Sequence, residues 1–297
     1  MKIALLGSTG LLGSELETIL SNDHILIPFS SQKAPLHDAT TLTTALEAIL
    51  PVDLVINAAA MTAVDDAETQ KETAENSNHY GVENLAIFCS KHAIPLIHFS
   101  TDYVFDGEEN TPYVESHDPN PINVYGQSKL DGERVIQTHC SHFLIFRIQS
   151  LFGSKGKNFI TTILNLAESN DQLSIISDQW MSPTWSRDVA GMIAKLLTHM
   201  ETAATLPFGS ISTGIYHYTS SEFSNWANVA RFILATQKHL TLSNIPSIKN
   251  IPSSAYPQAA KRPSFSVLNC DKFDRLRLCK RPSWKDAIRS FLRDEFG

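Results

Sequence analysis

Short apolar runs alternate with amphipathic stretches over the first half of the chain. Apolar runs of four to eight residues predict buried strands, and apolar positions repeated every three to four residues predict helices. Strands are expected at residues 2–6, 24–29, 53–60, 94–99 and 142–152, and helices at about 11–20, 40–50, 73–92 and after residue 123. This alternation predicts an α/β fold with a doubly wound parallel sheet of the Rossmann type.

Beyond residue 152 the pattern is less regular. Helices are expected at 158–168 and 185–200, strands at 173–177 and 214–218, and a helix from an N-cap at Ser220 to about Thr236. We expect 185–219 to return to the main sheet. The predicted division is a Rossmann domain of residues 1–152 and 185–219, and a smaller α/β domain of residues 153–184 and 220–297.

Composition excludes several classes of protein. The chain has 297 residues and a formal net charge of −7, which argues against a nucleic-acid partner or an anionic membrane. No apolar run approaches membrane-spanning length, and Gly7 ends the first apolar run too early for a signal peptide. The four cysteines form no CxxC pair, so reduced thiols and a cytoplasmic location are expected.

A glycine-rich segment joins the first predicted strand to the first helix. It reads Gly7-Ser8-Thr9-Gly10-Leu11-Leu12-Gly13. In a strand–turn–helix unit, glycines at these positions allow a tight turn, close approach of backbone to a pyrophosphate, and close packing of helix on strand. The segment therefore predicts a dinucleotide site formed by Gly7, Thr9, Gly10, Leu11, Leu12 and Gly13.

The end of the second strand indicates which dinucleotide is bound. An NAD site usually has an acidic residue there for the ribose 2′-hydroxyl, whereas this chain has Ser30, Ser31 and Lys33. We expect NADPH, with NADH left open as an alternative. Asp38 either contacts the adenine or caps the following helix. Further cofactor contacts are expected where later strands and helices reach the same edge of the sheet, at Ala58, Ala59, Ala60, Asn78 and Ser100.

Tyr125 and Lys129 are the strongest catalytic candidates. A spacing of four places both side chains on one face of a helix, and Tyr125 is the one tyrosine of seven with a lysine at this spacing. A lysine charge stabilises a phenolate, so the phenol becomes a usable acid near neutral pH. A solvated helical pair is the alternative. Thr101, at the end of the fourth predicted strand, offers a hydroxyl to a reacting carbonyl.

Other polar clusters are weaker candidates for a functional site. His139-Cys140-Ser141-His142 spans a helix end and a strand start, so surface histidines are favoured over a metal site and no metal is expected. There is no GxSxG nucleophile motif. Lys155, Lys157 and the Lys261-Arg262 pair are basic in an acidic chain, and they either face solvent or bind a phosphate-bearing substrate.

Taken together, the glycine-rich turn, the Ser100-Thr101-Asp102-Tyr103-Val104-Phe105-Asp106-Gly107 run and the Tyr125/Lys129 pair resemble the extended short-chain dehydrogenase/reductase superfamily. More narrowly, the chain resembles the dTDP-4-dehydrorhamnose reductase family. The runs 55–65 and 123–133, Asn158-Phe159, Asp178-Gln179 with Pro183-Thr184, and Arg262-Pro263 also match, so the resemblance covers essentially the whole chain.

The resemblance implies reduction of the 4-keto group of a dTDP-linked deoxysugar by a nicotinamide hydride. Thr101, Tyr125 and Lys129 would be catalytic, the Rossmann domain would bind NADP, and the smaller domain would bind the nucleotide sugar. The implied substrate contacts are Thr62, Val64, Asp65, Thr101, Asp102, Tyr103, Ser150, Asn158, Phe159 and Arg262. A homodimer is compatible with the sequence but not specified by it.

Three departures from the family pattern fall in the substrate half. Ser150 replaces a tryptophan associated with the sugar pocket, Met181 replaces a glycine, and Phe265 replaces an asparagine. The reaction type is therefore better supported than the sugar.

Two other functions compete with this one. A dehydratase of the same superfamily would be expected to have glutamate where this chain has Tyr103, so elimination is disfavoured. A non-catalytic NADP-binding regulatory subunit, resembling the β subunit of methionine adenosyltransferase, remains the alternative from a different class.

Overall fold

A parallel sheet forms the centre of the molecule. The computed structural model describes residues 1–202, 207–237 and 245–296. The six-stranded sheet has the order β2-β1-β3-β4-β5-β10, and every neighbouring pair is parallel. Its strands are β1 (Lys2–Leu6), β2 (Ile25–Phe29), β3 (Leu54–Asn57), β4 (Leu96–Thr101), β5 (Phe143–Ile148) and β10 (Gly214–His217). The predicted doubly wound Rossmann sheet is confirmed.

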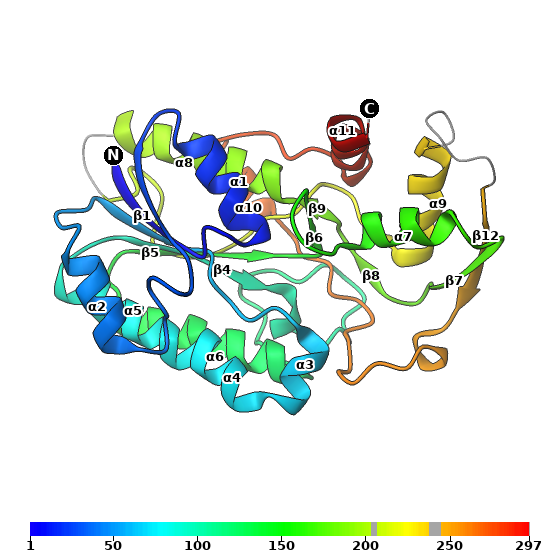
Figure 1. Cartoon of the computed structure of the whole chain (residues 1–297), viewed down its shortest axis with the longest axis horizontal. Coiled ribbons are helices and arrows are strands. Elements are labelled where there is room, and N and C mark those ends of the chain that lie inside the picture. Colours follow the sequence, from blue (N-terminus) through cyan, green and yellow to red (C-terminus); the bar gives the residue numbers. More distant parts are fainter. Residues whose placement is uncertain (203–206, 238–244, 297) are drawn as a thin grey trace.

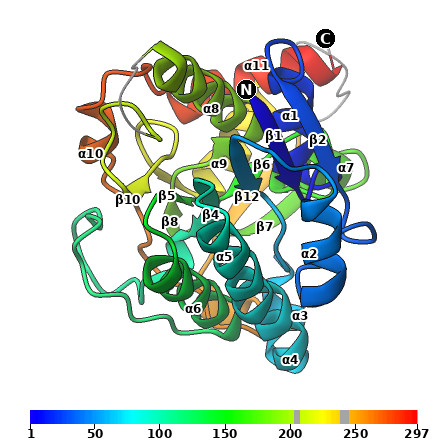
Figure 2. The ribbon, with the colours of Figure 1, turned by 90° about the vertical axis from the view of Figure 1, so that its left-hand side faces the viewer.

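Helices cover both faces of the sheet, as Figures 1 and 2 show. On one face lie α1 (Leu11–Leu20) and α8 (Ser186–Thr202), and on the other lie α2 (Ala39–Glu47), α5 (Gly81–Lys91) and α6 (Val124–His139). Alternate residues of the strands point to opposite faces, so Ile3 and Leu5 pack with α1 and α8 while Ala4 and Leu6 pack with α2 and α5. The inner strands β1, β3, β4 and β5 are buried on both faces, which explains their largely apolar runs, whereas Ile25 and Pro28 of the edge strand β2 are exposed.

Two of the predicted elements are interrupted. The helix expected at 73–92 is α4 (Lys71–Glu75), a π-helical turn η1 (Asn76–Tyr80) and α5, and a further helix, α3 (Val64–Thr69), precedes it. The strand expected at 142–152 stops at Ile148, because Ser150 adopts a left-handed conformation with φ 46°. Its continuation, β6 (Leu151–Phe152), leaves the main sheet and pairs with β9 (Thr184–Trp185).

The prediction that a helix starts at Ser220 is wrong for the first turn of that helix. Helix α9 (Trp226–Gln237) begins six residues later. Ser224–Asn225 is a short strand, β11, paired with β8 (Trp180–Met181), so these residues make sheet hydrogen bonds instead of the first helical turn. The side chain of Asn225, not of Ser220, accepts a hydrogen bond from the first turn, at 2.9 Å from Asn228 N.

A smaller group of elements packs beside the end of the sheet (Figure 1). It contains α7 (Phe159–Ala167), β7 (Gln172–Ile176), α9, β12 (Ser247–Ile251) and α11 (Trp284–Phe296). These elements share a hydrophobic cluster that includes Phe152, Ile163, Trp185 and Phe291. By contrast, Phe273 of α10 (Asp271–Asp274) packs into the core of the main sheet. Phe152 and Trp185, which the prediction assigns to the Rossmann part, likewise pack with the smaller group, so the two-domain division stays a proposal.

No helix in the described ranges is both long and apolar enough to cross a membrane. All four cysteines are free thiols; Cys89, Cys140 and Cys270 are buried, and Cys279 is half-buried.

Candidate active site

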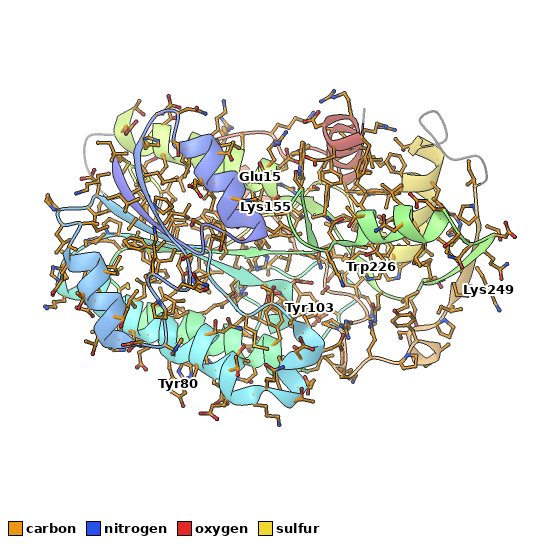
Figure 3. The ribbon with its side chains drawn as sticks, in the orientation of Figure 1. Glu15, Tyr80, Tyr103, Lys155, Trp226 and Lys249 are labelled. Atoms are coloured by element: carbon orange, nitrogen blue, oxygen red, sulfur yellow. The ribbon has the colours of Figure 1, made fainter. Side chains whose placement is uncertain are left out.

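A cavity of about 430 Å³ opens at the carboxyl edge of the sheet, where the chain leaves β1, β3, β4 and β5. Parallel α/β sheets bind ligands at this edge. Figure 3 labels two residues from its lining, Tyr103 and Trp226, in the middle of the molecule. The complete lining is Gly10, Leu11, Leu12, Ala58, Ala59, Ala60, Thr62, Val64, Phe99, Ser100, Thr101, Asp102, Tyr103, Tyr125, Lys129, Ile148, Ser150, Leu151, Lys157 and Trp226.

The glycine-rich turn forms one end of this cavity. Gly7 has φ 75°, and a Cβ there would lie 2.5 Å from Ala59 N. A Cβ on Gly13 would lie 2.0 Å from Gly7 O, so α1 can approach the turn only because residue 13 has no side chain. In the described part of the chain, no side chain caps the first turn of α1. Its N–H groups and the positive end of the helix dipole therefore suit a pyrophosphate.

A second cavity of about 230 Å³ adjoins the first and shares Gly10, Ala58, Ala59 and Ala60 with it. Gly7, Thr9 and Ser31, three of the predicted cofactor residues, also line it. The sequence missed five lining residues, which lie in the loop after β2 or next to Asn78: Ala34, Pro35, Leu36, His37 and Ser77. For the four residues in that loop, the position after a strand was the one available signal, and no signal pointed to Ser77, which lies in η1.

Five predicted cofactor residues line neither cavity: Gly13, Ser30, Lys33, Asp38 and Asn78. Asp38 takes the second of its two expected roles and caps α2, accepting from Thr40 N at 3.1 Å and Thr41 N at 3.0 Å. The buried Asn78 amide bonds both polar backbone atoms of Met61 and donates to Ser128 Oγ at 3.0 Å. Asn78 therefore braces α6 behind the cavity.

Tyr125 and Thr101 face the middle of the large cavity from α6 and β4. Burial raises the pKa of Tyr125 to about 12, while its hydrogen bond with Thr101 lowers the pKa and the nearby Asp102 raises it. The hydroxyls of Thr101 and Tyr125 thus meet in the cavity, as expected for two groups that bind one carbonyl oxygen. Ser100 Oγ, in the same lining, is buried and has no hydrogen-bond partner among the described residues, which leaves it free for a ligand.

Lys129 lies one turn after Tyr125 and is buried. Its Nζ donates to Phe99 O at 2.7 Å and lies 3.1 Å from His98 Nε2. Burial lowers the pKa of Lys129 to about 8, although the charge of Glu133 raises it. In this arrangement Lys129 Nζ is held by Phe99 O of β4, and burial dominates the pKa of Tyr125, so the expected stabilisation of the phenolate by Lys129 stays a prediction.

Asp102 is buried under the catalytic candidates, and burial raises its pKa to about 6. Gln149 Nε2 donates to Asp102 Oδ2 at 2.7 Å and to Ser266 Oγ at 2.7 Å, and Gln149 Oε1 accepts from Ser182 N at 2.8 Å. Gln149, which the sequence did not single out as a site residue, therefore ties the end of β4 to two segments of the smaller domain.

Residues from distant parts of the chain line the side of the large cavity away from the glycine-rich turn. Thr62, Val64, Tyr103 and Ser150, which the resemblance implies as substrate contacts, line the large cavity together with Lys157 from the basic loop. Trp226 also lines it, and its ring centroid lies 4.5 Å from that of Phe159. The sequence missed Trp226, because it was placed inside a helix that was expected to begin at Ser220.

Three other predicted substrate residues are engaged with protein groups. Arg262 and Asp65 form an ion pair with a distance of 2.6 Å between Nη2 and Oδ2. The Arg262 hydrogen bond lowers the pKa of Asp65 to about 2. Asn158 caps α7 by accepting from Thr161 N at 3.1 Å. None of the three lines the cavity.

Among the residues described, no group of three His, Cys, Asp or Glu side chains is arranged to hold a metal. His139 lies 3.5 Å from Glu83, and the thiol of Cys140 points to Ala86 O at 3.5 Å.

Residues 1–296 match the family model described as RmlD substrate binding domain. The chain belongs to this family. It is similar to the dTDP-4-dehydrorhamnose reductase of Burkholderia thailandensis, with 36% identity over 298 residues that cover 99% of each protein. The enzyme of the same name from Escherichia coli strain K12 is 33% identical over 304 residues, covering 100% of this chain and 98% of the relative.

A solved structure from the same group is also similar. The dTDP-4-dehydrorhamnose reductase of Bacillus anthracis, solved in complex with NADP, has a TM-score of 0.89 and 27% identity. The match covers 99% of this chain and 100% of that one. Membership of the RmlD substrate binding domain family thus extends over residues 1–296, which include every residue that lines the large cavity.

Proposed function

We propose that this protein is an NADPH-dependent reductase that acts on the 4-keto group of a dTDP-linked deoxysugar, in the synthesis of deoxysugar or polysaccharide precursors. One observation carries this proposal. A single cavity joins the glycine-rich turn at Gly10 to Tyr125 and Lys129, and then to Lys157 and Trp226 of the smaller domain. A cofactor and a nucleotide sugar can therefore meet at the Tyr125 hydroxyl.

Each part of the cavity has a different role in the proposed reaction. The turn from Gly7 to Gly13 holds the pyrophosphate, and NADPH, when bound, supplies the hydride. Thr101 orients the carbonyl oxygen, and the Tyr125 O–H bond breaks as its proton passes to that oxygen. Lys129 binds the nicotinamide ribose and stabilises the phenolate in its ammonium form. On the substrate side, Lys157 attracts the diphosphate and Trp226 offers an aromatic face.

The direct test is oxidation of NADPH in the presence of dTDP- and UDP-linked 4-keto sugars, with Tyr125→Phe as the inactive control. We expect turnover with at least one dTDP-linked sugar. A protein that binds NADPH but oxidises it with none of these sugars would instead be a regulatory subunit, and co-purification with a synthetase would support that outcome.

The coenzyme preference is tested in the same assay. Ser31 lines the smaller cavity, and there is no carboxylate among residues 30–33 to repel a 2′-phosphate. The value of kcat/KM should therefore be higher with NADPH than with NADH. Ser31→Asp should reverse this preference, and a wild-type preference for NADH would exclude our assignment.

Two finer points are part of the proposal. The free thiols support a reducing, cytoplasmic location. A homodimer is proposed as the working state, and sedimentation velocity at assay concentrations tests it directly.

A further inference from the structure

The contacts of Lys129 continue into the protein interior through two residues that the sequence did not single out for any role. His98 in β4 and Asn57 in β3 are register partners in the sheet, and both are fully buried. Asn57 Nδ2 lies 3.0 Å from His98 Nδ1, and His98 Nε2 lies 3.1 Å from Lys129 Nζ. The three side chains form one continuous chain of hydrogen bonds that ends at the catalytic lysine.

Both ends of this chain are fixed by the backbone. Ala59 N lies 3.0 Å from Asn57 Oδ1, and because a backbone N–H can only donate, the amide must turn its NH₂ group towards His98. At the other end, Phe99 O can only accept, and it receives a hydrogen bond from Lys129 Nζ at 2.7 Å.

The direction of the bonds between these ends follows from the charge of His98. Burial, and then the nearby charge of Lys129, lowers the pKa of His98 well below its ordinary value, so the ring is neutral and has one N–H. Since Nδ1 accepts from Asn57, the proton is on Nε2 and points at Lys129. An ammonium nitrogen has no lone pair to accept it, whereas a neutral amine has one.

We propose that Asn57 and His98 are positioning residues that favour the neutral amine of Lys129 by directing a hydrogen-bond donor at Nζ. When Lys129 is an ammonium, one of the two hydrogen bonds of His98 is lost. With the His98 proton on Nε2 the bond to Lys129 is lost, and with the proton on Nδ1 the bond from Asn57 is lost. The catalytic consequence rests on the proposed function. A phenolate at Tyr125 needs the ammonium beside it, so reduction should decline at alkaline pH where Lys129 loses its proton.

Other charged and titratable groups face Lys129 from the elements around it. Glu133 follows it by one turn on α6 and favours the ammonium, but Glu133 is itself paired with Arg147 of β5 at 2.6 Å. Tyr125 precedes it on α6, and Asp102 belongs to η2 (Asp102–Val104). These groups also affect the protonation of Lys129, but they are unchanged in the variants below.

The first measurement needs no turnover. In protein labelled with ¹⁵N-histidine, the ring nitrogen shifts report which nitrogen has the proton, and the spectrum of His98→Gln identifies the His98 signals by their loss. We expect the Nε2–H tautomer in the wild type at neutral pH. An Nδ1–H tautomer would overturn the proposal. Failure of the proposed enzymatic function would leave this result unaffected, so the two failures are distinguishable.

The second measurement is the alkaline limb of the pH profile of kcat/KM. In Asn57→Asp both carboxylate oxygens accept, so His98 must place its proton on Nδ1 and accept from an ammonium. The alkaline limb of the kcat/KM profile should therefore move to higher pH by about one unit or more, which is a tenfold or greater increase in the proton affinity of Lys129.

Asn57→Asp changes the direction of the hydrogen bonds and also adds a negative charge. Two uncharged variants of His98 separate these two effects. Glutamine at position 98 still reaches Lys129 with an NH₂ group, while asparagine is too short. His98→Gln should therefore keep the wild-type limb, and His98→Asn should move it upwards. Equal profiles for these two variants would contradict a role of His98 in setting the protonation of Lys129. If the Asn57 variant fails to fold, this pair and the wild-type tautomer still decide the question.

Discussion

Glu133 and Arg147 form a doubly hydrogen-bonded ion pair inside the protein, with Nε to Oε1 at 2.9 Å and Nη2 to Oε2 at 2.6 Å. Both side chains are at most 2% exposed. The pair joins α6 to β5 one turn after Lys129, and Arg147 also lies over the ring of Phe105 at 5.0 Å. The position of α6, the helix of Tyr125 and Lys129, on the sheet therefore depends on a buried pair of charges.

Removing one member of this pair should be strongly destabilising. Glu133→Gln keeps the shape of the side chain but leaves the Arg147 charge without its partner, and such changes typically cost about 3–5 kcal/mol. Urea unfolding measures the loss. The matched control is Asp131→Asn on the exposed side of the same helix, where the ion pair with Arg134 should contribute at most about 1 kcal/mol. Equal losses in the two variants would show that the buried pair is not important for stability.

Tyr125→Phe should separate chemistry from binding. The substitution removes one hydroxyl and keeps the ring, and general acid catalysis typically contributes about 10²–10⁴ in rate. We expect kcat to fall by that factor while the Kd for NADPH stays within about twofold, because the proton moves only in the transition state. Lys129→Met should weaken both turnover and NADPH binding.

Single-turnover kinetics and NADPH titration of these two variants provide the measurement. Undiminished reduction by the phenylalanine variant would remove Tyr125 from the mechanism.

Asp102 should make stability depend on pH. Burial raises its pKa from 3.8 to about 6, so between these values the folded protein binds more protons than the unfolded chain. The contribution of Asp102 to stability is therefore most favourable below about pH 4 and is lost as the pH rises through 6, by up to about 3 kcal/mol.

Asp102→Asn removes this titration. The difference in unfolding free energy between variant and wild type should shift in favour of the variant between pH 4 and pH 7. Urea unfolding at intervals across this range gives the slope, and parallel curves for the two proteins would be inconsistent with a raised pKa.

The sugar preference should differ from that of relatives with tryptophan in place of Ser150. A missing aromatic face removes contact area that typically contributes on the order of 1 kcal/mol or more to binding. Trp226 supplies the aromatic surface in this cavity from a different element. We expect a preferred substrate other than dTDP-4-dehydrorhamnose, or weaker binding of that sugar.

A panel of dTDP-linked 4-keto sugars measures this preference, and Trp226→Ala should raise KM for the preferred one by about tenfold. If dTDP-4-dehydrorhamnose is the best of the panel with a micromolar KM, the argument from Ser150 is wrong.

Features that depend on neighbouring residues in the chain could be predicted from the sequence. The strand–turn–helix around Gly7 and Gly13 follows from local backbone geometry, since Gly7 has φ 75° and a Cβ on Gly13 would collide with Gly7 O. Tyr125 and Lys129 share a helix face because of the helical repeat. The alternation of buried strands and amphipathic helices was sufficient to predict the parallel sheet.

Features that depend on distant residues were decided by the tertiary structure. Asp65 and Arg262, 197 residues apart, pair with each other instead of lining the cavity. Gln149 bridges three segments, and His98 points at Lys129 only because β4 lies beneath α6. Whether a buried polar group faces a ligand or another protein group is set by which segments fold against it. Hydrophobic periodicity predicts that a residue is buried, but it does not identify the polar group that the buried residue contacts.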